Sequence, residues 1–507
     1  MSHLSRLEAP TALSPAHKVP PGVLSGPITS TMFRLALPTI AVLVVQTLVG
    51  VAETYFVSSL GTDALAGVTL VFPVLMLMQM MSNGGVGGGV ASAIARALGA
   101  NRHADADALV WHSIVLACVF GIVFMAAALL GGPVLYRAMG GKEPTLTAAL
   151  AYSGVVFAGS IPIWIVALLT SALRGAGNVN VPALVILFGA LVLIPLSPAL
   201  IFGWGILPQL GVAGAATAVV IYYILASLVL MLYLRSPRSL LKLRIVPLQG
   251  RLFKDILGVG FLAAIGTVQV NLTVTFVTAA VGRFGADAIA GYGIASRIDY
   301  LQIPVLFGLG TAIVTMVGIN IGADQMARAR RIAWAGGAIA FGVTQLIGIA
   351  AAVFPYAWIG LFSDNPQVQE LGAIYLRNVA PVYGAVGLGL ALYFASQGAK
   401  RVLFPVLAGT ARMIIAAFIG WSAVIWYGAN LSTLFQIVAL ASVTYGALTA
   451  AVIVFGGAWS RRPANHPLSP SPAPPNSGGD GKRWLPHTFA RLLHQGESTS
   501  KFAKGRP

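Results

Sequence analysis

Glu53 is the only acidic side chain within the long apolar stretches of the first half of the chain. A carboxylate in an apolar segment is costly, and such groups usually face a cavity or take part in ion or proton exchange. Gln46, Gly50 and Glu53 are spaced four and three residues apart, so in a helix they share one face. We therefore predict that Glu53 and Gln46 belong to a cation-coupling site. The alternative is that Glu53, about five residues from a loop, snorkels to the membrane surface.

A second set of polar side chains lies in apolar stretches of the second half. Arg297 and Asp299 are two residues apart, so in a helix they point to nearly opposite sides and each needs its own partner. We expect a substrate cavity lined by these two residues together with Gln269, Asn271 and Tyr300. An equal alternative is that the charged pair only anchors its helix. We predict no metal site and no enzymatic activity, because the histidines lack metal-ligand spacing and no catalytic Ser, His and Asp arrangement is present.

The composition identifies the elements that must position these residues. The chain is 57% hydrophobic and 9% charged, with a mean hydropathy of +0.85, which is typical of a membrane protein. Twelve stretches are long and apolar enough to cross a bilayer as helices. They are residues 33–58, 64–95, 108–131, 147–172, 181–202, 211–234, 254–281, 287–318, 332–355, 372–396, 403–427 and 432–458. The predicted fold is therefore an all-α membrane protein.

The chain also contains an internal duplication. Residues 85–184 align with residues 308–407 at a shift of about 223, and LGTDALAG (60–67) returns as FGADAIAG (284–291), one residue out of step. Each copy holds six predicted spans, so both enter the membrane from the same side. Parallel repeats of this kind are a transporter architecture, with the transport path between two pseudo-symmetric six-helix lobes.

Charge sets the expected orientation. Lys and Arg are concentrated in the loops that lie inside if the N-terminus is inside, Arg96, Arg102 and Arg174 among them. The opposite loops hold only Arg137, Lys142, Arg283 and Arg377. We therefore expect both termini in the cytoplasm. This asymmetry and a basic tail account for the net charge of +17, so we predict contact with the lipid bilayer and none with nucleic acid.

The predicted domains follow from these boundaries. Residues 1–30 form a cytoplasmic N-terminal segment, 31–234 the N-lobe, 235–253 a cytoplasmic linker, 254–458 the C-lobe, and 459–507 a disordered basic tail. Within the tail, residues 482–495 have an apolar and a basic helical face and could lie on the inner leaflet, although a solvated tail is the more common case.

Several segments together resemble the MATE family of multidrug and toxic compound extrusion transporters. They are LALPTIAVLVVQTLVGVAETYFVSSLGTDALAG (35–67), ALGAN (97–101) with its echo GINIGAD (318–324), LRGAGN (173–178) and IFGWGILPQLGVAGAATA (201–218). The resemblance implies a V-shaped fold of two six-helix lobes in the inner membrane of a bacterium. It also implies export of small organic compounds, cationic or amphipathic, in exchange for protons or sodium. We expect no cofactor beyond the coupling ion, and a monomer.

The resemblance places Glu53 where the family's first span carries an Asp that is implicated in cation coupling. In the fifth span, Leu193 and Ser197 stand where many bacterial members carry an Asn and an Asp. Because a sodium ion needs several oxygen ligands and a proton needs one group, we favour proton coupling over sodium, with Ser197 as a remaining polar group of the site.

Three alternative functions remain. A major facilitator carrier lacks support, since ALGANRHADA stands where that class carries its Gly, Asp and Arg signature after the second span. A membrane-embedded enzyme would need polar groups clustered near one interface. The strongest alternative is a flippase for lipid-linked saccharides from the wider superfamily, which would often have more spans and a more cationic cavity.

Overall fold

The computed structural model describes residues 22–205 and 207–455, and these residues form helices and connecting loops with no strand. The first half contains α1 (Ile28–Ser58), α2 (Thr62–Met80), the π-helical turn η2 (Met81–Val86), α3 (Gly87–Gly99), α4 (His103–Ala138), α5 (Thr145–Ala158), α6 (Ser160–Gly175), α7 (Asn180–Phe202) and α8 (Val212–Arg235). We call α1–α8 the N-lobe. The predicted tail, with its segment 482–495, lies outside the described residues.

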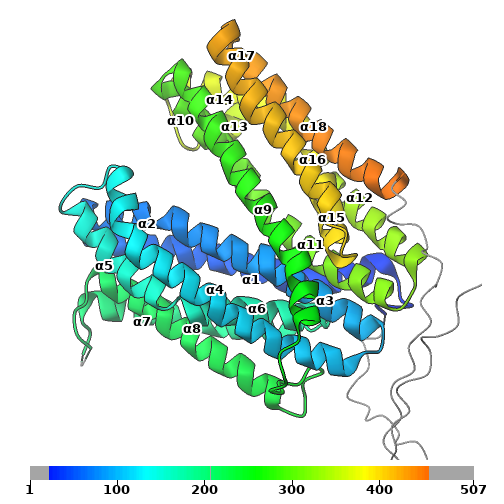
Figure 1. Cartoon of the computed structure of the whole chain (residues 1–507). Helices are drawn as coiled ribbons and strands as arrows, with labels where there is room; N and C mark the ends of the chain where they lie inside the picture. The colour runs from blue at the N-terminus through cyan, green and yellow to red at the C-terminus, as the bar shows by residue number, and fades with distance from the viewer. Residues whose placement is uncertain (1–21, 206, 456–507) are drawn as a thin grey trace, which may run out of the picture. The chain divides into compact units, whose positions relative to one another are not determined.

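The second half, called the C-lobe, repeats this order (Figure 1). It contains α9 (Gly250–Val281), η3 (Gly282–Phe284), α10 (Ala286–Ala295), α11 (Arg297–Gly322), α12 (Met326–Val353), α13 (Pro355–Ile359), α14 (Pro366–Val379), η4 (Ala380–Val382), α15 (Tyr383–Gly398), α16 (Leu403–Met413), η5 (Ile414–Ile419), α17 (Gly420–Tyr427) and α18 (Leu431–Phe455). Contacts group the described residues of both lobes into one compact unit.

The described residues hold eleven segments long and apolar enough to cross a membrane, or twelve if α5 and α6 count as one bent span. The all-α prediction with twelve spans is therefore confirmed. The fourth predicted span is not straight, because α5 and α6 meet at an angle of 51°. Gly159 separates them, and a Cβ at this residue would lie 2.4 Å from a methyl group of Val220, so only glycine lets α8 pass this close. The tenth span is interrupted at the equivalent place, by η4.

The duplication is visible in the backbone of the connecting turns. Asn101 and Asp324 are equivalent at a shift of 223 residues, and they have φ angles of 58° and 57°. Gly177 and Lys400 form a second equivalent pair, with φ angles of 79° and 57°. Left-handed backbone is uncommon for residues other than glycine, so its return at equivalent sites shows that both copies make the same turns.

The lobes are joined where α3 packs against α11. A Cβ at Gly99 would lie 2.0 Å from the carbonyl oxygen of Ile319, and a Cβ at the equivalent Gly322 would lie 2.2 Å from that of Arg96. Either side chain would collide with backbone of the other helix. These two glycines define what we call the closed end of the molecule.

The first helix crosses the predicted lobe boundary. Met32, Leu35 and Ala36 at the start of α1 are buried in the same apolar cluster as Leu309 and Ile313 of α11. Further along α1, Val49 and Val57 belong instead to the main N-lobe cluster. The first span therefore contributes to the cores of both lobes, and it continues the contact of the lobes away from the closed end.

Candidate functional site

A pocket lies between the lobes, next to the closed end, and its walls follow the duplication. Residues of α3, η2 and α6 line one side and residues of α11 and α15 line the other. At the shift of 223 residues, five N-lobe lining residues have a C-lobe equivalent that also lines it. These pairs are Gly84 and Phe307, Gly88 and Thr311, Ala91 and Val314, Ser171 and Phe394, and Arg174 and Gln397. The pocket therefore lies on the pseudo-two-fold axis, and we call it the axial pocket.

Two polar side chains of the axial pocket, Arg174 and Gln397, form an equivalent pair. Arg174 is 8% exposed, and its guanidinium donates to the Ser171 hydroxyl at 3.0 Å. Gln397 is fully buried, and the Tyr393 hydroxyl lies close to its amide. The backbone at both sites is held in the same way: the Ser92 hydroxyl donates to the carbonyl oxygen of Gln397, and the equivalent Thr315 hydroxyl donates to that of Arg174.

A second pocket lies inside the N-lobe, and its polar lining comes from four spans. Gln46 of α1 and Gln79 of α2 line it together with Thr170 of α6 and Tyr223 of α8. Asn83 lines this N-lobe pocket and the axial pocket alike. The two pockets are therefore adjacent, and polar side chains continue from one to the other.

Glu53 lies beside this N-lobe pocket. Its carboxylate interacts electrostatically with Tyr152 of α5 and with Tyr223, which lines the pocket. The Oε1 atom is fully buried and has no hydrogen-bond partner. An outward snorkelling arrangement does not account for a buried oxygen, so the carboxylate points into the lobe. Glu53 and Gln46 thus lie on the same side of α1, and Gln46, which lines the N-lobe pocket, is itself exposed.

Ser197 is the third residue predicted to take part in coupling. It is fully buried in α7, its Oγ has no partner, and it does not line either pocket. It precedes the last residue of α7 by five positions, as Glu53 precedes the last residue of α1. The first and fifth spans run in the same direction and α1 packs against α7, so both residues lie at a similar depth.

The predicted C-lobe residues do not form one site. Asp299 accepts a hydrogen bond from the Tyr375 hydroxyl at 2.7 Å, whereas the Arg297 guanidinium lies over the Phe362 ring, 5.5 Å from its centroid. These separate partners agree with the expectation from their spacing. Tyr300 is 59% exposed on the same helix. None of the three lines the axial pocket or the N-lobe pocket.

The two predicted site residues of α9 also have different surroundings. The Gln269 amide donates to the Thr410 hydroxyl of α16 at 2.7 Å, and its own oxygen is buried without a partner. Asn271 is exposed and donates to the carbonyl oxygen of Thr267, one turn earlier in the helix. Gln269 therefore ties two C-lobe helices together, and Asn271 satisfies its own helix.

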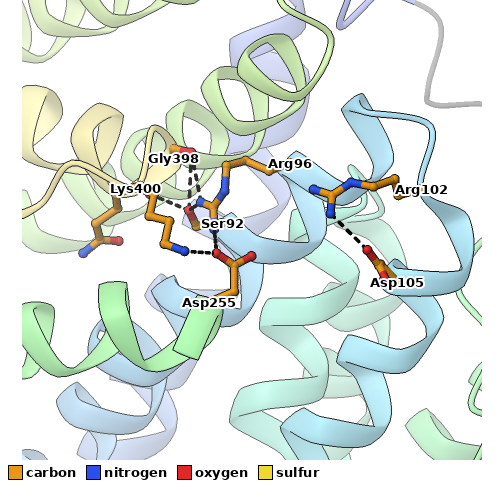
Figure 2. Close-up of polar contacts among 8 residues, drawn as sticks. Ser92, Arg96, Arg102, Asp105, Asp255, Gly398 and Lys400 are labelled. Carbon is orange, nitrogen blue, oxygen red and sulfur yellow. Dashed lines mark hydrogen bonds and ion pairs between the residues drawn. The ribbon is translucent and has the colours of Figure 1, made fainter. Parts of the chain in front are cut away.

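Figure 2 shows an ion network at the closed end that the sequence did not reveal. Arg96 of α3 and Lys400, which follows α15, both contact Asp255 at the start of α9, and the Arg96 to Asp255 distance is 3.0 Å. Arg96 also donates to Ser92 and to the carbonyl oxygen of Gly398. Nearby, Asp105 of α4 pairs with Arg102 and with Arg251 of α9. The network joins N-lobe helices to C-lobe residues.

Two arginines expected in loops lie elsewhere. Arg96 and Arg174 lie within α3 and α6 and are only 9% and 8% exposed. They are buried because the C-lobe copy packs over them, a contact that loop counting does not consider. Among the described residues, no group of three or more His, Cys, Asp or Glu side chains could hold a metal ion.

The fold and the pockets define a duplicated, two-lobed membrane transporter. A family model described as MatE matches residues 38–199 and 263–422, more than half of the chain, so the chain belongs to the MatE family. It is a transporter and not an enzyme.

Individual relatives cover most of the chain. It is 30% identical to a "Probable multidrug resistance protein NorM" of Burkholderia mallei, over 79% of this chain and 87% of that protein. It is 24% identical to a "FAD transporter" of Shewanella oneidensis, over 78% of this chain and 87% of that protein. A crystal structure of "MATE in the bent conformation" superposes with a TM-score of 0.79 at 25% identity, and covers 87% of this chain and 97% of that one.

Proposed function

We propose that the protein is a secondary active antiporter that exports organic compounds in exchange for protons, with Glu53 as the proton carrier. The proposal rests on the buried Glu53 carboxylate, which has one unpartnered oxygen and lies beside the polar N-lobe pocket. This pocket shares Asn83 with the axial pocket. A carboxylate that gains or loses a proton there changes the charge of the N-lobe interior while the substrate path lies next to it.

The surroundings of Glu53 favour a proton over sodium. A sodium ion exchanges its hydration shell for several oxygen ligands, and Leu193, which stands where many bacterial members carry an Asn, supplies none from its side chain. Ser197 supplies one further oxygen at a similar depth. A proton needs no such set, because hydration of the pocket is enough to switch the affinity of one carboxyl group.

Export is supported by the relatives. One is described as a probable multidrug resistance protein, and another as a FAD transporter, so the family handles more than one class of organic solute. The cationic substrates that the resemblance implied draw no support from the two pockets, since no acidic side chain lines either one.

We further propose that the closed end faces the cytoplasm, because α1 starts there and the positively charged loops lie on that side. The structure would then be an outward-facing state in the inner membrane. In a Cys118→Ser background, cysteines at the exposed residues Lys142 and Asp364 should react with an impermeant thiol reagent outside intact cells. Cysteines at the exposed residues Arg238 and Asp324 should react only after the membrane is opened. The reverse pattern would contradict this orientation.

The function is tested with everted membrane vesicles that contain the protein. An acidic vesicle interior should drive uptake of dyes and drugs, and an exchanger that collapses the pH gradient should stop it. Removing sodium should change nothing. Uptake that survives the loss of the pH gradient but requires sodium would overturn proton coupling. Movement of a lipid-linked saccharide with no uptake of any dye or drug would favour the flippase alternative.

A further inference from the structure

We infer that the linker between the lobes, together with the first turn of α9, is a docking surface for anionic lipid head groups. This surface, called the linker face, consists of two exposed apolar and four exposed basic residues: Ile245, Leu248, Arg235, Arg238, Arg244 and Lys254. It meets the leaflet at the closed end, which is the inner leaflet in the orientation proposed above. The inference goes beyond the proposed export function and does not depend on the coupling ion.

The linker is tied to two N-lobe helices at the edge of their apolar stretches. The Lys242 backbone N–H donates to the Asp107 carboxylate at 2.8 Å, and the Leu243 N–H donates to the carbonyl oxygen of Leu234 at 3.1 Å. Asp107 directly precedes the apolar stretch of α4, and Leu234 ends that of α8. The linker therefore crosses both helices at the boundary of the hydrocarbon layer.

The linker then follows α4 for a little more than one turn. The Gln249 backbone N–H donates to the Nε2 atom of His112 at 2.8 Å. His112 lies five residues beyond Asp107, about 7.5 Å further along the helix. Residues 242–249 form neither helix nor strand, and irregular backbone is not stable against lipid hydrocarbon. The segment therefore fits the head-group region next to the hydrocarbon boundary.

The linker has an inner and an outer side. Leu241 is fully buried, and Leu243 and Val246 pack against the main N-lobe cluster. Ile245 and Leu248, in contrast, are 75% and 56% exposed. Apolar side chains at this depth are covered by lipid, as on the apolar face of a helix that lies in the membrane interface.

The charge of the linker face favours anionic lipid. Residues 235–254 contain six Lys or Arg residues and no Asp or Glu. Two of the six are engaged within the protein, because Arg251 pairs with Asp105 and the Lys242 ammonium donates to the carbonyl oxygen of Ser236. None of the ion pairs among the described residues involves the four basic residues of the linker face. Lipid phosphate groups would supply their counter-charge.

Other basic side chains at the closed end provide a comparison. Arg96 and Lys400 contact Asp255, and Arg328 donates to the carbonyl oxygen of Gly26. These cations lie against acceptors of the protein itself. The four cations of the linker face are exposed beside apolar side chains that are exposed as well. A surface that combines both features matches a lipid leaflet better than a soluble anion.

The first test measures the depth of the linker face in the full-length protein in nanodiscs. In a Cys118→Ser background, an NBD fluorophore on Ile245→Cys should show apolar emission and be quenched by nitroxide-labelled lipid. The same fluorophore on Asp324→Cys, in an exposed turn at the closed end, should show aqueous emission. Aqueous emission at residue 245 would overturn the inference. Apolar emission that the labelled lipid does not quench would also overturn it, because a protein segment would then cover the linker face.

The second test measures lipid selectivity by thermal unfolding in detergent with added phosphatidylglycerol or phosphatidylcholine. Wild type should be stabilised by phosphatidylglycerol at a concentration about 10-fold or more below that needed for phosphatidylcholine. Joint replacement of Arg238, Arg244 and Lys254 by Gln should remove most of this preference, and salt should reduce it in wild type. The matched control replaces three exposed basic residues of the opposite loops by Gln and should keep the preference: Arg137, Lys142 and Arg283.

A further variant separates the apolar from the basic part of the linker face. Joint replacement of Ile245 and Leu248 by Ser should weaken the response to both lipids by several-fold and keep the preference for phosphatidylglycerol. An equal preference in wild type and in the variant without the three basic residues would overturn the inference. Equal stabilisation of wild type by inorganic phosphate at the same concentration would overturn it too. Proton-driven uptake tests the antiporter separately, so either proposal can fail alone.

Discussion

The two lobes are copies of one fold, yet three charged N-lobe side chains that are buried or partly buried have uncharged equivalents in the C-lobe. With the shift of 224 residues near the start of each copy and 223 further along, the pairs are Glu53 and Val277, Arg96 and Ile319, and Arg174 and Gln397. All six residues lie in helices. The backbone turns and glycine contacts are the same in both copies. The duplication therefore preserved the backbone architecture, whereas these charges differ.

The difference is most instructive at the closed end, where two equivalent seams join the lobes. On one seam, Arg96 of α3, Asp255 of α9 and Lys400 form an ion network. On the other, Ile319 replaces the arginine and is fully buried, and Asn320 and Arg328 instead hydrogen-bond to the carbonyl oxygen of Val23 before α1. One seam is therefore held by charges that can separate, and the other by apolar packing and a backbone segment.

The largest expected effect on stability comes from the glycine contacts that both copies make at the closed end. Gly99→Ala and Gly322→Ala should each destabilise the folded protein by about 1–3 kcal/mol or more, since the new Cβ meets backbone of the other lobe. The two losses should be similar, because the contacts are equivalent. Thermal unfolding in detergent measures them, and Gly131→Ala, whose Cβ would meet no atom within 4 Å, is the control. A large loss of stability at only one of the two glycines would contradict the equivalence of the two contacts.

The next largest effect on stability comes from the ion network at the closed end. Asp255→Asn leaves the buried Arg96 without its counter-charge, which should weaken the closed end by about 2 kcal/mol, below the value for a fully buried pair. Distance measurements between spin labels across the closed end should then show an added open population. Glu370→Gln breaks an exposed pair within α14 and should leave the distances unchanged. Identical distributions for Asp255→Asn and wild type would show that the seam does not depend on charge.

The outer part of the same network gives the smallest effect. Lys400 also contacts Asp255, but its side chain is 43% exposed, so solvent screens the interaction. Lys400→Gln should destabilise the closed end by less than about 1 kcal/mol, and salt should reduce the difference from wild type. Thermal unfolding at low and high ionic strength measures this. A loss as large as that of Asp255→Asn would place the main counter-charge of Asp255 on Lys400 and not on Arg96.

The sequence was sufficient for the spans and the duplication, because both depend on local composition and on a repeat within one chain. It also singles out Glu53, since one carboxylate in an apolar stretch is conspicuous, and the coupling role of Glu53 stays a prediction. It was not sufficient for Arg96 and Arg174, whose positions at the ends of apolar stretches are typical of loop residues. Their burial depends on partners 159 residues away for Arg96 and across the pseudo-axis for Arg174, and no local pattern indicates those contacts.

The axial pocket could have been suspected from the alignment of the two copies. LTSALRGAGN and LYFASQGAKR are equivalent, so symmetry alone places Arg174 opposite Gln397 if that segment lies near the axis. What the alignment does not supply is the distance of the segment from the axis. The contact of α3 with α11 sets this distance, and it is fixed by the tertiary packing of glycines.

We propose that the Glu53 carboxylate of the N-lobe couples transport to protons. The most direct measurement compares Glu53→Gln with Asp299→Asn in proteoliposomes with an imposed pH gradient, alongside equilibrium binding of the same substrate. Glu53→Gln should lose gradient-driven transport and keep binding, Glu53→Asp should retain part of the activity, and Asp299→Asn should remain coupled. Normal transport against a gradient by Glu53→Gln, with its loss in Asp299→Asn, would contradict the account and place the proton path in the C-lobe.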